Sequence, residues 1–218
     1  WLINCSNIKP HIYFLDLIAQ MWRKGTADAE VHRHEYARCY YGRENEKKVA
    51  DCISQYAEYA VKYGVHEDDH AGEQFANHVA RMLMSQMMCD RTQRCSGLLW
   101  ATDADDLRGQ AAWYETLCEE AAIRYATYLE KCERVRMDLS GAGKRLFEDT
   151  VLLQVSLFQN CYQGAALAAK SILATLDGAY RTAFYLAGKA RKAYLSADEA
   201  MRSREHGKWH NFYAIECL

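Results

Sequence analysis

Apolar residues recur at helical spacing along almost the whole of this 218-residue chain, and glycine interrupts the pattern far more often than proline does. The single proline, Pro10, stands where a first helical turn can begin, a position that tolerates its missing N–H. Helical stretches then run up to Gly25, Gly42 and Gly64, and glycine at such positions favours a helix stop. Strands and helices do not alternate, and no fixed repeat is present. The pattern therefore predicts an all-α fold.

The second half of the chain carries three longer helical stretches, at residues 104–137, 144–178 and 179–207. The first of them has an apolar stripe that we expect to face the core, formed by Trp113, Leu117, Ala121, Tyr125, Tyr128 and Cys132. Together with the shorter stretches, these predict an antiparallel bundle of five to six helices. The apolar opening "WLI" has strand character, so a short N-terminal strand remnant is expected as well.

Composition narrows the class of partner. The formal net charge of -2 shows no basic excess, which argues against a nucleic-acid partner. No run of about 18 apolar residues predicts a membrane span. The sequence begins without methionine or a signal peptide, so we expect the natural N-terminus to lie upstream.

The nine cysteines are scattered and none forms Cys-x-x-Cys, a usage typical of free thiols packed as small apolar residues. Free thiols favour a reducing cytoplasm, although secretion of a longer parent protein stays open.

One literal match to a metal motif occurs, at His66-Glu67-Asp68-Asp69-His70, which has the H-E-x-x-H pattern of zinc proteases. The two intervening aspartates and the flanking glycines, Gly64 and Gly72, favour a solvated connection instead of a buried helix. A di-metal carboxylate bundle needs Glu-x-x-His on two core helices, and only Glu67 and His70 have that spacing. No metal site and no catalytic residue is therefore predicted from the motifs.

Other polar and aromatic patterns have plain structural explanations. His32 and His34 lie two apart, so on a helix they point in different directions. "MLMSQMM" at residues 82–88 is either core filler, which we favour, or the wall of a pliable groove. Several tyrosines follow helix faces and are either ordinary half-buried side chains, which we favour, or the lining of a groove between subunits or domains: Tyr40, Tyr41, Tyr56, Tyr59 and Tyr63.

The opening "WLINCSNIKP" and the apolar helix after it resemble a known junction. In glycoside hydrolase family 115, the xylan α-glucuronidases, the last strand of the catalytic barrel runs into Asn-Val-Gly-Asp-Leu-Lys-Pro and then into a helical domain. Residues 4–10 correspond to that segment, with Ser6 and Asn7 in place of its Gly and Asp. "YYGRENEKKVADCISQYAEYA" and "HGKWHNFY" are similar to later segments of the family in the same order.

The resemblance implies a division of the chain and a function. Residues 1–8 would be the remnant of a barrel strand and its turn, residues 9–205 a helical bundle, and residues 206–218 an exit toward a further domain. Family members remove glucuronic acid from xylan without a cofactor, using carboxylates on the barrel. The implied partners are the catalytic barrel of the same parent and, through it, a carbohydrate, and a homodimer stays open. The isolated chain is expected to be inactive.

Two residues of the opening segment carry specific expectations. Asn4 follows the apolar strand residues, and the active sites of such barrels gather at the C-terminal ends of the strands. Asn4 is therefore the one candidate for contacting substrate, and capping of the strand-to-helix turn is its alternative role. Lys9 is expected to be structural. The function class that competes with an accessory domain is a stand-alone helical module that binds a partner helix or peptide through its Met and Tyr surfaces.

Overall fold

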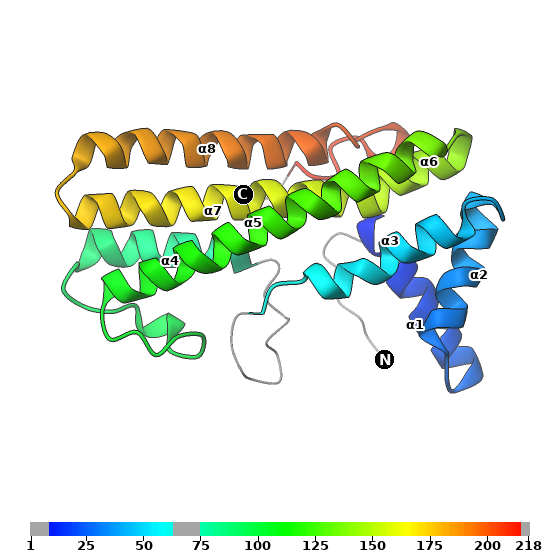
Figure 1. The fold of residues 1–218 in the computed structure, drawn as a ribbon, viewed down its shortest axis with the longest axis horizontal. Coiled ribbons are helices and arrows are strands. Elements are labelled where there is room, and N and C mark those ends of the chain that lie inside the picture. Colours follow the sequence, from blue (N-terminus) through cyan, green and yellow to red (C-terminus); the bar gives the residue numbers. More distant parts are fainter. Residues whose placement is uncertain (1–8, 63–74, 215–218) are drawn as a thin grey trace. The chain divides into compact units, whose positions relative to one another are not determined.

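The computed structural model describes residues 9–62 and 75–214, and every regular element within these ranges is helical (Figure 1). The α-helices are α1 (Ile12–Lys24), α2 (Ala29–Tyr41), α3 (Glu46–Tyr59), α4 (Phe75–Cys89), α5 (Leu107–Asp138), α6 (Gly141–Phe147), α7 (Leu153–Leu176) and α8 (Tyr180–Arg202). Short 3-10 turns occupy Lys9–His11, Ser96–Leu98 and Gly207–Trp209. A π-helical segment, Glu148–Leu152, joins α6 directly to α7.

The predicted all-α class is confirmed, but the predicted number of helices is wrong. Because α6, the π-helical segment and α7 are continuous, the described residues form seven helices and not five to six. The N-terminal part alone contains three, since Gly25 and Gly42 adopt positive φ and end α1 and α2 separately. No strand occurs in residues 9–62 and 75–214, and the strand remnant predicted at residues 1–8 lies outside the described residues.

Side-chain capping fixes the start of α2. The Asp28 carboxylate accepts hydrogen bonds from the backbone N–H groups of Glu30 at 2.9 Å and Val31 at 3.0 Å. These bonds satisfy donors that have no partner within the first helical turn. Asp28 is therefore the N-cap that begins α2 after the break at Gly25.

The chain divides into two compact units. The first unit comprises Trp1–Tyr59 and Thr127–Ser156, and the second unit comprises Ala60–Ala126 and Leu157–Leu218. In the first unit α2 packs against α3, and Tyr41 meets Phe147 edge-on at 6.2 Å between ring centroids. Val49, Ala50 and Ile53 of α3 are buried in the same core.

The core of the second unit combines large aromatic rings with small side chains. Tyr125 of α5 stacks on Tyr162 of α7 with 5.6 Å between ring centroids, and both are fully buried. The buried Gln110 side chain pins the turn before Ser96, since it accepts a hydrogen bond from the Cys95 N–H at 2.7 Å and donates one to the Cys95 carbonyl at 3.0 Å. The buried side chains that α7 and α8 contribute to this core are mainly small, since most of them are alanines.

The apolar stripe of α5 differs from the prediction at its start. Tyr114 and Cys118 are buried, whereas the predicted Trp113 and Leu117 are only half-buried. From Ala121 onward the predicted and observed stripes coincide. Successive residues of a helix point about 100° apart. Which of two adjacent residues is buried at the start of α5 therefore depends on the helices that pack against that end of α5.

The described cysteines are free, as predicted. Cys39 and Cys89 are exposed, and the other five described cysteines are buried: Cys52, Cys95, Cys118, Cys132 and Cys161. Cys5 and Cys217 lie outside the described residues. Within residues 9–62 and 75–214, no helix combines the length and apolar character that crossing a membrane requires.

Candidate functional site

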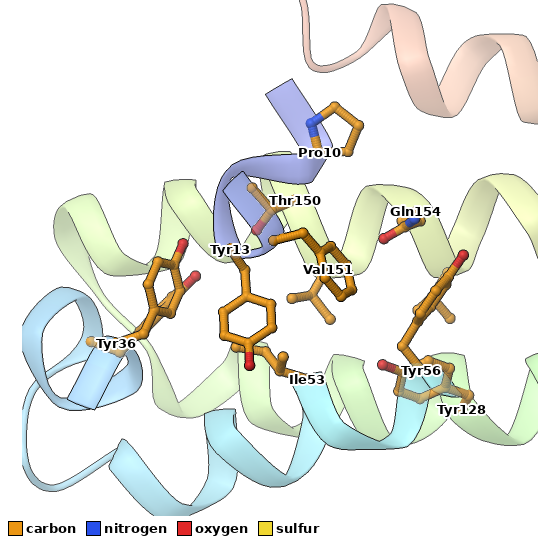
Figure 2. Close-up of a pocket in the computed structure, with 12 residues that line it drawn as sticks. Pro10, Tyr13, Tyr36, Ile53, Tyr56, Tyr128, Thr150, Val151 and Gln154 are labelled. Carbon is orange, nitrogen blue, oxygen red and sulfur yellow. The ribbon is translucent and has the colours of Figure 1, made fainter. Parts of the chain in front are cut away.

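A pocket in which half of the lining side chains are aromatic lies in the first unit (Figure 2). Its cavity measures about 20 Å³, room for about one water molecule. Its wall is formed by the first 3-10 turn, by α1, α2, α3 and α5, by the π-helical segment and by the start of α7. The lining residues are Pro10, Tyr13, Phe14, Tyr36, Tyr41, Ile53, Tyr56, Tyr128, Thr150, Val151, Gln154 and Val155.

Tyrosine is the dominant chemical group of this pocket, and burial keeps its phenols neutral. Burial raises the pKa of Tyr41 to about 12, an effect that the Thr150 and Tyr36 hydroxyls partly offset. Burial likewise raises the pKa values of Tyr36 and Tyr128 above their ordinary value. The Tyr128 hydroxyl donates a hydrogen bond to the backbone carbonyl of Cys52. At neutral pH these side chains can therefore donate and accept hydrogen bonds, but they supply no base.

Only part of the predicted tyrosine set lines the pocket. Tyr41 and Tyr56 do, while Tyr59 stacks on another pocket tyrosine at 4.8 Å between ring centroids. Tyr40 is 49% exposed, and Tyr63 lies outside the described residues. Tyr13, Tyr36 and Tyr128 were not in the predicted set, because the packing of separate helices brings them to the pocket.

A buried ion pair lies in the first unit, between two residues whose neighbours in the chain, Pro10 and Thr150, line the pocket. Lys9 Nζ is 3.3 Å from Asp149 Oδ2, and the two side chains are only 2% and 11% exposed. The 3-10 turn that contains Lys9 packs against the π-helical segment that contains Asp149. A π-helical segment is rare and marks functional or constrained positions more often than regular helix does. The expectation that Lys9 is structural agrees with this burial.

The two histidines of α2 point to different helices, as their spacing predicts. His32 is buried, stacks on Tyr13 at 5.5 Å between ring centroids, and places Nε2 3.3 Å from Asp16 of α1. His34 Nδ1 lies 3.2 Å from Glu46 Oε1 of α3. The Glu46 carboxylate also accepts a 2.7 Å hydrogen bond from Arg38, which holds the pKa of Glu46 below its usual value. These contacts join α2 to both of its neighbours.

Three residues singled out in the sequence, Asn4, His66 and His70, lie outside the described residues. In the part of the chain that the structure describes, no three His, Cys, Asp or Glu side chains gather into a group that could hold a metal ion.

Comparison with known proteins bears on the first unit. Residues 1–65 match the family model described as glycosyl hydrolase family 115. No curated protein and no solved structure matches the chain significantly. The matched stretch includes α1, α2 and α3 and contributes seven of the twelve pocket-lining residues, as well as Lys9. Over residues 1–65 the sequence is therefore similar to glycosyl hydrolase family 115.

Proposed function

We propose that this chain is the helical accessory domain of a glycoside hydrolase that resembles the family 115 xylan α-glucuronidases. In this proposal the catalytic barrel belongs to the same parent protein and precedes Lys9 in the sequence. The helical domain buttresses the barrel and contributes to the rim of its cleft. The family match to residues 1–65 supports a glycoside-hydrolase relationship, and the accessory role is the step that we add.

The observation that carries the proposal is the buried ion pair between Lys9 and Asp149. Lysine is rarely buried without a partner, because removing its charge from water is costly. Here it is buried at the end of the segment that resembles the exit from the barrel. Pro10 follows and restricts φ to a narrow range. The pair and the proline fix the direction in which the chain enters the first unit, which is what a rigid junction with a preceding strand requires.

The carboxylates of α5 illustrate why the proposal assigns catalysis to the barrel. Glycoside cleavage uses two carboxyl groups held about 5–10 Å apart across the bond. Burial and the nearby Glu119 raise the pKa of Glu115, so this carboxyl group holds its proton to a higher pH than an ordinary glutamate does. However, Lys170 Nζ lies 3.9 Å from Glu115 and also pairs with Glu119, so both carboxylates are already engaged by a side chain of the same chain. This arrangement is that of a surface ion-pair network.

Release of sugar acid from glucuronoxylan tests the proposal, with three proteins compared. The parent with its barrel should release glucuronic acid or a related sugar acid, whereas the isolated chain should not. The parent carrying Asn4→Ala should turn over more slowly while its helical content stays unchanged, because Asn4 precedes the helical core. Robust turnover by the isolated chain would refute the accessory role. Unchanged kinetics with Asn4→Ala would leave that role standing and reduce Asn4 to a turn residue.

The competing function, a stand-alone helical interaction module, is favoured by exposed aromatic side chains on α8. Tyr180 and Tyr185 are each 63% exposed, and Phe184 is 84% exposed. Side chains of this type are enriched in protein interfaces. The coding sequence upstream of Trp1 separates the two functions: an open reading frame that encodes a barrel supports the accessory domain, and a start codon near Trp1 supports the module.

A further inference from the structure

A second and much larger cavity lies in the second unit, between α4, α7 and α8. Its volume is about 660 Å³, within the range of roughly 300–1,000 Å³ that small-molecule sites occupy. Apolar residues from all three helices make up most of its wall: Met84, Met87, Ala168, Ile172, Ala187 and Leu195. We call this cavity the α4–α8 groove.

The walls of the α4–α8 groove combine rigid and adaptable parts. The buried Ala168 and Ala190 are small, which leaves room between α7 and α8. Tyr194 is held in place, since its ring packs over Gly164, where an added Cβ would meet ring carbons at 3.0–3.1 Å. Met84 and Met87 line the α4 side, and their unbranched side chains can adapt to a ligand. For the methionine-rich stretch at residues 82–88, the sequence left two explanations open, core filler and the wall of a groove. Met84 and Met87 fit the second.

Among the described residues that line this groove, one carries a positive charge. Arg191 of α8 is exposed and belongs to the wall. None of the ion pairs found within residues 9–62 and 75–214 includes Arg191, and α8 carries no acidic residue from Tyr180 through Ala197. The acid in the wall, Asp198, pairs with Arg202 at 3.4 Å and lies about 10 Å farther along the helix. The charge facing the groove near Arg191 is therefore positive.

We propose that the α4–α8 groove binds a small amphiphile that has an apolar tail and a carboxylate head. The tail lies against the methionine and alanine side chains, where burial of apolar surface supplies most of the binding free energy. The head pairs with Arg191, whose planar guanidinium can donate two parallel hydrogen bonds to a carboxylate. The wall residues of α8 from Ala187 to Asp198 extend over about 16 Å, which suits a medium-length chain. This site is separate from the proposed accessory role and does not depend on it.

Isothermal titration calorimetry on the full chain tests this assignment with three probes that share a ten-carbon tail: decanoate, decanol and decylammonium, each below its aggregation concentration. Decanoate should bind with one-to-one stoichiometry, and decylammonium at least tenfold more weakly. Because this comparison uses the unaltered chain, it does not depend on whether any variant folds. Absence of decanoate binding, or equal affinity for all three head groups, would overturn the proposal.

Matched variants then locate the site. Arg191→Met should weaken decanoate binding at least tenfold, while Lys192→Met, which removes the neighbouring charge outside the groove wall, should change it less than twofold. Ala187→Phe should block the groove, and Thr182→Phe, on an exposed part of α8 outside the wall, should not. Equal losses from Arg191→Met and Lys192→Met would indicate a general positive field and contradict the role of Arg191. Circular dichroism confirms that each variant keeps its helical content.

Discussion

Replacing Asp149 by alanine tests how the first unit holds the N-terminal segment. The substitution leaves the Lys9 ammonium, only 2% exposed, without the carboxylate that lies 3.3 Å away. Breaking a buried ion pair by removing one partner costs about 3–5 kcal/mol, because the remaining charge stays buried. We therefore expect Asp149→Ala to lower the free energy of unfolding by about that amount, measured by urea denaturation followed by circular dichroism at neutral pH.

An exposed ion pair provides the matched control. Lys48 also pairs with an aspartate, Asp138, but both side chains are about half exposed, at 51% and 50%. Asp138→Ala should cost no more than about 1 kcal/mol, since water screens the pair. The double variant Lys9→Met/Asp149→Leu should recover most of the loss, because two apolar side chains leave no buried charge. If Asp149→Ala cost no more than Asp138→Ala, the reasoning from burial would be wrong.

Three further predictions concern packing, hydrogen bonding and pH. Gly164→Ala should destabilise the protein by about 1–3 kcal/mol, because the added methyl group would press on the Tyr194 ring. Gly188→Ala, in open space on α8, should instead stabilise it by about 0.5–1 kcal/mol. Thermal denaturation of the two variants measures the difference. Tyr128→Phe should cost about 0.5–1.5 kcal/mol, measured in the same way, because it removes a buried hydrogen bond. The pKa of Tyr41 rises to about 12 on folding, from an unfolded value of about 10, so its contribution to the free energy of unfolding should be fully present below pH 10 and decrease as the pH rises toward 12. Alkaline denaturation monitored by tyrosinate absorbance measures this decrease, and a stability that does not change over this pH range would contradict the prediction.

Local sequence signals predicted the helices well. Gly25 and Gly42 mark the ends of α1 and α2 because both need positive φ, which glycine adopts without strain. The spacing of His32 and His34 was enough to send them to different helices. The predicted total of five to six helices was nevertheless too low, although the breaks at Gly25 and Gly42 were visible in the sequence, because the described residues form seven helices.

The features that define the candidate site depend on contacts between distant residues, which the pattern did not reveal. Nothing in "EDTVL" distinguishes the π-helical segment from regular helix, and Lys9 finds its partner there only after folding. The Tyr36 and Tyr128 side chains likewise line one pocket from different helices. The register of the α5 stripe shifted by one residue at Tyr114 for the same reason: its neighbours decide which of two adjacent faces is buried.

The most direct measurement of the accessory role compares the parent enzyme with its barrel expressed without the helical region. The shortened protein should have a lower melting temperature and a lower rate of sugar-acid release than the parent. Adding this chain in trans provides a control, since partial recovery would show that the lost function comes from the helical region. A barrel that keeps its full melting temperature and turnover alone would contradict the account.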